Sequence, residues 1–343
     1  MGVDLSPLIE DELKQEIQLE SLNGKKLSID AYNALYQFLT TIRGEDGSPL
    51  MDSQGRITSH LSGLFYRTIN FLEKGLKVVY VFDGKSPELK AKEIEERKKA
   101  REEALKMYEE ARAQGNEELM RKYATRAASL KTYMVEDSKR LLDLLGVPWV
   151  EAPSEGEAQA AYMAFKNVTW GSVSQDYDSL LFNSPRLIRN LTVSGRRKLP
   201  NKDVYVEISP EIIETDRFLK YYGITREQLV DIAILIGTDF NIGVKGIGPK
   251  TALKLIKKYG RIEDIKEIPH LSELLPPELV NEVRKIFLEP QVKEVQNLEW
   301  RQPDEEGLIK FLCEERNFSE ERVRNAIQRI KKRPAAGALD QWF

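Results

Sequence analysis

Seven acidic residues stand at positions where carboxylates could do chemistry. Each follows a strand-like or apolar run, or begins a helix-like run, and almost no Lys or Arg stands beside them; they are Asp30, Asp83, Glu155, Glu157, Asp176, Asp178 and Asp239. Gathered together, they would repel one another strongly unless cations neutralised them. Mg²⁺ and Mn²⁺ prefer such oxygen ligands. Two of these ions can activate a water and stabilise the leaving oxygen in phosphate-ester hydrolysis.

Each acidic residue taken alone has an ordinary structural explanation. An Asp after a strand is usually a turn or cap residue. In APSEGEAQAAYMAF (152–165), Ser154 and Glu157 have the spacing of a capping box at a helix start. Glu155 is then left without a structural task, because the capping box needs only Glu157. The two glutamates could therefore start a helix, bind a metal, or do both.

The elements that must position these residues alternate between strands and helices. Strand-like runs occupy 26–30, 77–83, 171–174, 186–191 and 203–208, and an amphipathic helix is expected at 59–75. This alternation predicts an α/β fold with a mainly parallel central sheet flanked by helices. The run 77–83 is continuously apolar, as in a strand buried on both faces. Because ligands bind outside the carboxyl ends of parallel strands, we expect Asp30, Asp83 and Asp176 to lie together.

Residues 86–140 are dense in Lys, Arg and Glu and break once, at 114–116. This pattern predicts two long charged helices that project from the body as a hairpin. Most of these charges are expected to form a solvated face with pairs at i,i+4. Lys90 and Arg97 are seven residues apart and therefore share a helix face.

From residue 225 onward the pattern is mostly helical. GVKGIGPKTALKLIKKYG (243–260) predicts a glycine turn between two helices, with Pro249 at a first helical position. It is not a P-loop, because Pro249 separates Gly248 from Lys250. Free backbone N–H groups in such a turn can hold a phosphate. Four lysines add positive charge there: Lys245, Lys250, Lys254 and Lys257.

The composition sets limits on the class of protein. The chain has 343 residues, is 41% hydrophobic and 31% charged, and carries a net charge of −3. The hydrophobic and charged fractions are typical of a globular protein. The net negative charge argues weakly against nucleic acid as partner, although a cluster of carboxylates could mask a basic surface in the net charge. One cysteine and two histidines exclude a disulfide framework and the usual zinc sites. With neither a membrane-length apolar run nor a signal peptide, the expected location is intracellular and soluble, in the cytoplasm or nucleoid if the source is archaeal.

The motifs together resemble the flap endonucleases, the structure-specific 5′ nucleases of replication and repair, of the archaeal and eukaryotic type. The resemblance runs from residue 1 to about 330 in family order and spacing. Its segments are MGVDL, LSIDAYNALYQFL, TSHLSGLFYRTI, VYVFDGKSPELK, APSEGEAQAA, QDYDSLLF, ILIGTDFNIGVKGIGPKTA and LIKFLCEERNFSEERV.

The resemblance implies an activity. The chain would be a 5′ flap endonuclease with 5′→3′ exonuclease activity that cuts branched DNA at the base of the flap. The reaction would be two-metal-ion phosphodiester hydrolysis, serving Okazaki-fragment maturation and long-patch base excision repair. Two Mg²⁺ ions per site are implied, with Mn²⁺ as a plausible substitute.

The resemblance also implies roles for particular residues. The family's metal carboxylates fall on the same seven acidic residues. Lys90 and Arg97 would meet the scissile phosphate, Tyr36 would stack on the reacting nucleotide, and the charged hairpin would be the arch through which the flap threads. The glycine turn would contribute DNA contacts from Lys245, Gly246, Gly248, Lys250 and Lys254, and carbonyls for K⁺ from Gly243, Val244 and Ile247. A pocket for a 3′ flap would be lined by Arg43, Thr58, Arg316 and Phe318.

The organisation implied is a single nuclease domain over 1–330 with a flexible tail. Its parts are an N-terminal nuclease region (1–101), the arch (86–140), an internal nuclease region (142–230), a helix-hairpin-helix (231–262), a C-terminal helical region (263–330) and the tail (331–343). Leu339, Trp342 and Phe343 match the family's motif for the sliding clamp PCNA. Ala336 stands where that motif begins with Gln, so we expect weaker clamp binding through 336–343. The nuclease itself is expected to be a monomer without a membrane partner.

Three other functions fit part of the pattern. Asp176-Tyr177-Asp178 imitates the D-x-D loop of haloacid-dehalogenase-like phosphatases, but GSVSQ before it is a poor buried strand, and Asp30, Asp83 and Glu155 would be idle. A DNA-binding scaffold using the glycine turn alone gives no reason for seven carboxylates. A nucleotide-excision nuclease of the same superfamily would need a much longer insertion than 86–140.

Overall fold

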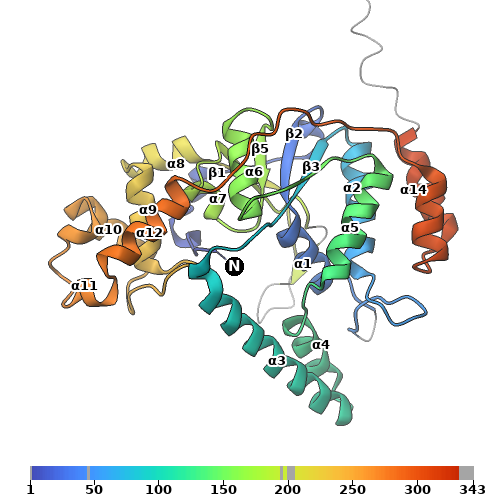
Figure 1. The fold of residues 1–343 in the computed structure, drawn as a ribbon, viewed down its shortest axis with the longest axis horizontal. Helices are drawn as coiled ribbons and strands as arrows, with labels where there is room; N and C mark the ends of the chain where they lie inside the picture. Colours follow the sequence, from blue (N-terminus) through green and yellow to red (C-terminus); the bar gives the residue numbers. More distant parts are fainter. Residues whose placement is uncertain (1, 45–46, 194–195, 199–204, 332–343) are drawn as a thin grey trace, which may run out of the picture.

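Strand β3 (Lys77–Phe82) shows how the apolar runs build the sheet. The structure is a computed structural model that describes residues 2–44, 47–193, 196–198 and 205–331 (Figure 1). Val78, Tyr80 and Phe82 pack into one core, whereas Val79 and Val81 pack into another on the opposite face. The prediction of a strand buried on both faces is confirmed.

The main sheet has seven strands in the order β1-β9-β6-β5-β2-β3-β4. Strands β6, β5, β2, β3 and β4 pair in parallel, and β9 runs antiparallel to both β6 and β1. The mainly parallel sheet is therefore confirmed. The strands other than β3 are β1 (Lys14–Glu16), β2 (Lys26–Asp30), β4 (Trp149–Glu151), β5 (Gly171–Val173), β6 (Arg186–Arg189) and β9 (Glu211–Glu214). The run 203–208 contributes β8 (Tyr205–Glu207), which pairs with β7 (Arg196–Lys198) outside this sheet.

Strand β5 corrects one expectation about polarity. The run GSVS looked too polar for a buried strand, yet β5 is buried between β2 and β6. Its central Ser172 is 1% exposed and donates to Ser184 Oγ at 2.8 Å. A buried hydroxyl with a partner has little desolvation cost.

Helices cover both faces of the sheet (Figure 1). Helix α6 packs on β2, β3 and β5, whereas α1 and α2 pack on the opposite face. The helices of this layer and their neighbours are α1 (Ala31–Thr41), α2 (Ser59–Glu73), α5 (Thr132–Leu145), α6 (Gly156–Phe165), α7 (Asp178–Leu181) and α8 (Thr215–Tyr222). No helix of the described residues is long and apolar enough to cross a membrane.

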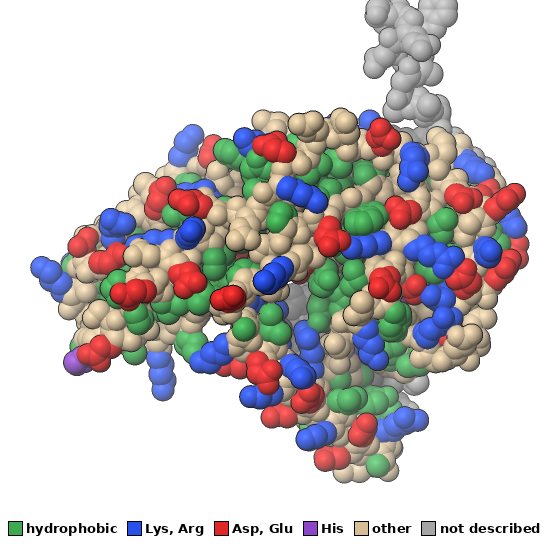
Figure 2. Space-filling model, in the orientation of Figure 1, with side chains coloured by type: hydrophobic (Ala, Val, Ile, Leu, Met, Phe, Trp, Pro, Cys, Tyr) green, Lys and Arg blue, Asp and Glu red, His purple; other side chains and the backbone are tan. Residues whose placement is uncertain are grey.

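Two charged helices project from the body as an arch (Figure 1). Helix α3 (Ala91–Ala113) and helix α4 (Glu117–Arg126) meet at the predicted break, where the Asn116 side chain accepts a hydrogen bond from the Leu119 N–H and caps α4. Lys and Arg alternate with Asp and Glu over their visible surface (Figure 2). The second helix is short. The projecting part ends by Arg126, because α5 packs on α2 in the body.

The glycine turn lies between α9 (Arg226–Ile236) and α10 (Pro249–Tyr259), with Gly248 as N-cap and Pro249 at the first helical position, as predicted. Helices α11 (Leu271–Leu274) and α12 (Pro277–Leu288) follow, and α12 packs on α9.

The segment 290–304, here the crossing segment, contains no helix or strand, although a helical region was expected there. Its backbone is bound by the body instead. Lys293 exchanges two hydrogen bonds with the Gln159 amide, and Trp300 Nε1 donates to Val78 O at 2.8 Å. Beyond it, α13 (Glu305–Leu308) packs on α5, and α14 (Glu320–Lys331) packs on α2. Residues 17–82 and 308–327 therefore share one core.

Candidate active site

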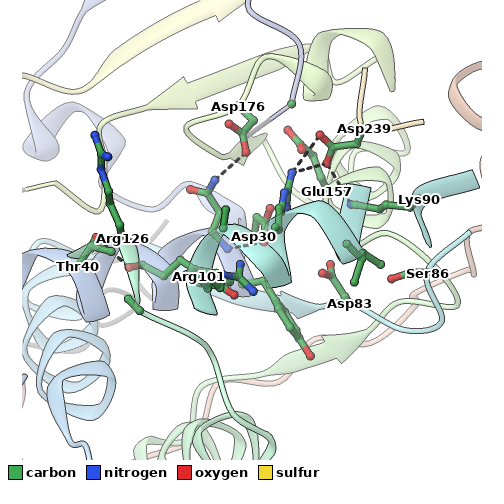
Figure 3. A pocket seen from close by; sticks show the side chains of 18 of the residues that line it. Asp30, Thr40, Asp83, Ser86, Lys90, Arg101, Arg126, Glu157, Asp176 and Asp239 are labelled. Atoms are coloured by element: carbon green, nitrogen blue, oxygen red, sulfur yellow. Dashed lines mark hydrogen bonds and ion pairs between the residues drawn. The ribbon is translucent and has the colours of Figure 1, made fainter. Parts of the chain in front are cut away.

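All seven acidic residues line one cavity between the sheet and the arch. Its volume is about 870 Å³, and it is also lined by Tyr36, Lys90 and Arg97. Figure 3 shows Lys90 with Asp30, Asp83, Glu157, Asp176 and Asp239 around this cavity. The structure thus brings together the candidates for metal and catalysis that the sequence indicated. Of the residues that the structure describes around this cavity, none is His or Cys, so the lining offers oxygen donors.

Two of the carboxylates come from the ends of neighbouring strands. Asp30 ends β2, and its Oδ1 accepts from the Asn33 N–H at 3.0 Å, which starts α1. Asp83 follows β3, and its Oδ1 accepts from the Gly156 N–H at 2.7 Å. A Cβ on Gly156 would lie 2.7 Å from that same oxygen, so only glycine allows this approach.

The capping box predicted at Ser154 and Glu157 is wrong. Helix α6 begins at Gly156 with Glu155 as N-cap, and no side chain caps it from that position. Asp83, which follows β3, accepts from the Gly156 N–H instead. The Glu157 carboxylate accepts from the backbone N–H and the hydroxyl of Ser179, at 2.9 and 2.7 Å. Neither glutamate is occupied in capping its own helix, and both line the cavity.

The remaining carboxylates are held by three other parts of the chain. Asp178 begins α7 and accepts from the Val3 N–H at 2.7 Å, so the N-terminal segment lies against the site. Gly2 has φ +37°, and a Cβ there would lie 2.6 Å from Asp178 Oδ1. Asp176 accepts from Asn33 Nδ2 at 3.1 Å. Asp239 follows α9 and faces the arch.

Two cations of the arch reach these carboxylates directly. Lys90 Nζ lies 2.5 Å from Glu155 Oε2 and 3.4 Å from Asp239 Oδ2. Arg97 donates to both oxygens of Asp239, at 3.1 and 3.0 Å. Burial acts to raise the pKa of Asp239, but Lys90 and Arg97 outweigh it and hold that pKa below its ordinary value. The arch therefore closes over the acidic site through ion pairs.

At four other buried carboxylates, burial and neighbouring negative charges outweigh the favourable contacts with Lys90 and with hydrogen-bond donors. Burial and the nearby Asp83 raise the pKa of Asp30 to about 8. Burial also raises the pKa of Asp178 to about 7, and burial with Glu155 raises the pKa of Asp83 to about 6. The pKa of Glu157 is raised well above its ordinary value by burial and by Asp178. Bound cations would relieve these costs.

The donor set fits hard divalent cations such as Mg²⁺ or Mn²⁺. Within the described part of the chain, no three His, Cys, Asp or Glu side chains form a group ready to hold a metal ion. In this conformation two of the carboxylates are instead paired with Lys90 and Arg97.

These pKa shifts predict how stability depends on pH without metal. Asp30 and Asp178 have raised pKa values in the fold, so between about pH 4 and 8 the unfolded chain binds fewer protons than the native one. The free energy of unfolding of the metal-free protein should therefore decrease as the pH rises from about 4 to 8. Calorimetric melting in EDTA should show Tm falling by several degrees, and Mg²⁺ should restore most of the loss at high pH. Asp30→Asn should flatten the EDTA curve; a wild-type Tm that rises from pH 4 to 8 would contradict the expectation.

The aromatic and 3′-pocket candidates occupy distinct places. Tyr36 lines the cavity, and the Arg101 guanidinium lies 5.1 Å from its ring centroid. Arg316 is bound to both oxygens of Asp137, at 2.8 to 3.1 Å. Thr58 is buried and precedes α2, and Phe318 packs on the core that α2 lines. Arg43 has a different partner, since it donates to the carbonyl of Ala124 in α4 at 3.0 Å.

The glycine-turn candidates lie together between α9 and α10. Lys245, Lys250 and Lys254 are exposed. Gly246 has φ +87°, which favours glycine, and the Val244 carbonyl accepts from the Ile247 N–H at 3.0 Å. The clamp-motif candidates Leu339, Trp342 and Phe343 fall outside the described residues.

Sequence reasoning missed the contacts made by Asn33 and by the Val3 N–H. Asn33 had a weak signal, since it stands three residues after a strand-ending Asp, where a helix would expose its N–H. No local signal marks Val3, whose partner lies 175 residues away.

Comparison with known proteins agrees with this geometry. The XPG N-terminal domain matches residues 1–104, and the XPG I-region matches residues 146–239. Flap endonuclease 1 of Staphylothermus marinus is 59% identical over 352 residues, covering 100% of both chains. The Pyrococcus horikoshii protein of the same name is 56% identical, covering 100% of this chain and 98% of its own.

Two solved structures share the fold. Flap endonuclease-1 from Methanococcus jannaschii superposes with a TM-score of 0.70 at 41% identity, covering 94% of this chain and 96% of its own. The catalytic core of Rad2 in complex with a DNA substrate superposes with a TM-score of 0.70 at 25% identity, covering 96% of this chain and 100% of its own.

Proposed function

The chain belongs to the flap endonuclease family, and on that premise we propose that its seven cavity carboxylates and two arch cations form the catalytic centre. The chain is a divalent-metal-dependent nuclease that cuts branched DNA at the base of a 5′ flap. The observation that carries the assignment of residues is that all nine side chains line one cavity.

The seven carboxylates would serve as ligands of the divalent cations. We assign Asp30, Asp83, Glu155, Glu157, Asp176, Asp178 and Asp239 to two Mg²⁺ ions, with Mn²⁺ as substitute. Such ions supply an activated water and charge stabilisation at the leaving oxygen when bound. The carboxylates of this chain would hold these ions, and three of them, Asp83, Glu157 and Asp178, accept hydrogen bonds that fix their directions. The donors are the N–H groups of Gly156, Ser179 and Val3.

Lys90 and Arg97 would act on the DNA. In the DNA-free conformation they are paired with Glu155 and Asp239. A scissile phosphate and cations entering the cavity would compete for these partners, so both side chains would turn from carboxylate to phosphate. There they would stabilise the charge that grows on the phosphate in the transition state. Tyr36, at the same cavity, would stack on the reacting nucleotide.

The decisive experiment is a single-turnover assay on a double-flap DNA labelled at its 5′ end. Cleavage at the flap base should occur with Mg²⁺ or Mn²⁺ and stop in EDTA. A matched single-stranded oligonucleotide without a junction should be cut far more slowly. Cleavage of the double flap that persists in EDTA would overturn the metal assignment.

The phosphatase alternative is not retained. The argument that the run before Asp176 is too polar for a buried strand was wrong, since β5 is buried. Family membership over the full chain excludes the phosphatase instead, and it also excludes a scaffold without catalysis.

The glycine turn is the proposed duplex-binding surface. Lys245, Lys250 and Lys254 are exposed around it, where they could neutralise phosphates. The backbone N–H groups of Gly246 and Gly248 would contact the same strand. Carbonyls of Gly243, Val244 and Ile247 would hold K⁺.

The four residues assigned to a 3′-flap pocket, Arg43, Thr58, Arg316 and Phe318, would recognise the other side of the junction.

The tail is proposed to bind the sliding clamp PCNA, with the nuclease itself a monomer. Leu339, Trp342 and Phe343 stand at i, i+3 and i+4, so one helical turn would present all three to a hydrophobic groove. Deleting residues 336–343 should remove stimulation by the cognate clamp and leave basal cutting unchanged. Ala336→Gln should tighten the complex, because it restores polar contacts. Calorimetry with the clamp measures both; unchanged affinity after the deletion would place the anchor elsewhere.

A further inference from the structure

Asn33 contacts two of the proposed metal-site carboxylates at once. It lies in the first turn of α1, where its backbone N–H donates to Asp30 Oδ1 at 3.0 Å. Its side-chain Nδ2 donates to Asp176 Oδ2 at 3.1 Å. Its side-chain Oδ1 accepts from the Gln175 N–H at 3.3 Å. One residue therefore joins the start of α1 to the loop that follows β5.

The orientation of the Asn33 amide follows from these partners. Nδ2 faces a carboxylate, which can only accept when ionised, and Oδ1 faces a backbone N–H, which can only donate. A flipped amide would oppose two acceptors on one side and two donors on the other. Both contacts therefore need the amide in the orientation observed.

The position calls for a neutral donor. Asp30 ends β2 and Asp176 follows β5, and these strands are parallel neighbours with Ile29 beside Val173. Two carboxylates emerging side by side repel each other. An Asp in place of Asn33 would add a third negative charge and no donor, and an aliphatic residue would leave the Gln175 N–H without its partner.

The loop after β5 is held from two sides, and Asn33 supplies one of them. Arg189 Nε donates to the Gln175 carbonyl at 3.1 Å from the far side. Ser174 Oγ accepts the Asp176 N–H at 3.1 Å. These two contacts fix the loop backbone, whereas Asn33 also donates a hydrogen bond to the Asp176 carboxylate.

We propose that Asn33 is a positioning residue for the divalent cations: it sets the directions from which Asp30 and Asp176 offer their oxygens. The proposal rests on the proposed metal site. Partners that orient metal-ligating carboxylates typically change metal affinity or activity about 10- to 100-fold when they are lost.

The rival role for Asn33 is a direct contact with DNA, since its side chain lines the cavity. The two roles separate in the measurement. Loss of a positioning residue weakens cation binding measured in the absence of DNA. Loss of a DNA contact instead weakens DNA binding measured under conditions in which no cleavage occurs.

The test compares Asn33→Leu, which keeps the shape, and Asn33→Ala, which keeps only the backbone contact, with Gln37→Ala. Gln37 lies one turn further along α1, and its amide oxygen accepts from the Thr192 hydroxyl outside the cavity. Mn²⁺ binding is measured by calorimetry on the DNA-free protein. The Mg²⁺ concentration for half-maximal single-turnover rate and the Kd for flap DNA in Ca²⁺ are then measured, with melting in EDTA as a check of folding.

Both Asn33 variants should bind Mn²⁺ about 10- to 100-fold more weakly and need correspondingly more Mg²⁺. Their Kd for DNA should stay within about two-fold, high Mg²⁺ should recover much of the rate, and Gln37→Ala should match wild type. Unchanged Mn²⁺ affinity in Asn33→Ala would overturn the proposal, as would an equal loss in Gln37→Ala. If Asn33→Leu melts early, Asn33→Ala decides. Failure of wild type to cut flap DNA would instead overturn the proposed function, while the Mn²⁺ comparison would still judge Asn33.

Discussion

Asp83→Asn should lower the single-turnover rate of flap cleavage by on the order of 10³-fold or more, while DNA affinity stays within a few-fold. Asparagine has the shape of aspartate, and its Oδ1 can still accept the Gly156 N–H that starts α6. The substitution therefore keeps the local fold and removes one anionic oxygen from the proposed metal site. Single-turnover cleavage and fluorescence anisotropy on the same flap DNA measure the two quantities.

The same variant should be more stable than wild type in EDTA. Asp83 is buried beside Glu155, and that repulsion contributes to its raised pKa. Removing the charge relieves it, so Tm in EDTA should rise while activity collapses. Such opposite changes are typical of sites that hold charges together for function. Cleavage near the wild-type rate, or a fall in Tm without metal, would show that Asp83 serves structure rather than metal binding.

Arg97→Ala should slow cleavage by about 10²- to 10³-fold and weaken DNA binding only a few-fold. Arg97 is on the arch, and its guanidinium is bound to Asp239 in the absence of DNA. Its charge is therefore already held, with the side chain only 24% exposed, at the cavity that the phosphate must enter. Such a preorganised cation acts mainly on the transition state, so the rate should fall more than the affinity. Arg97→Lys should retain part of the rate, since lysine keeps the positive charge but lacks the planar guanidinium group that can donate two parallel hydrogen bonds.

Lys99→Ala is the matched control for Arg97. Lys99 is a cation on the same helix, is exposed, and is only loosely paired with Glu95 at 3.7 Å. It does not line the cavity. Removing it should leave the single-turnover rate unchanged. If Lys99→Ala and Arg97→Ala reduced DNA affinity equally and neither changed the rate, Arg97 would be a general phosphate contact.

The carboxylates could be located from the sequence because the rule that places them is topological. Asp30, Asp83 and Asp176 follow parallel strands, and the carboxyl ends of such strands meet at one edge whatever the side chains around them. The seven-residue spacing of Lys90 and Arg97 predicted only a shared helix face, and the family resemblance implied their place at the site. In the structure all five residues line the same cavity.

The failures have a common physical cause, which is competition from partners distant in the sequence. Ser154 and Glu157 have the spacing of a capping box, but Asp83 from β3 takes the first N–H of α6. The amide of Asn33 serves Asp176, which is 143 residues away. Ser172 is buried because Ser184 meets its hydroxyl. None of these partners can be inferred from local pattern, since pairing across the fold is decided only when strands and helices have docked.

The crossing segment has a consequence for how the protein is made. It carries the chain from α12 back to strand β3, which is synthesised early. Leu308, Phe311 and Ile327, which follow this segment, then complete the core around β2, β3 and α2. During synthesis on the ribosome, residues 26–82 therefore emerge long before the side chains that cover them. Domains usually fold as units in the order of their emergence, at about 5–20 residues per second. Here the unit is nearly the whole chain, so the first core must wait roughly tens of seconds, with apolar surface exposed, until the last helices leave the ribosome. A chain arrested before residue 305 should engage chaperones and should not become resistant to protease, whereas the full-length chain released from the ribosome should acquire that resistance in one step.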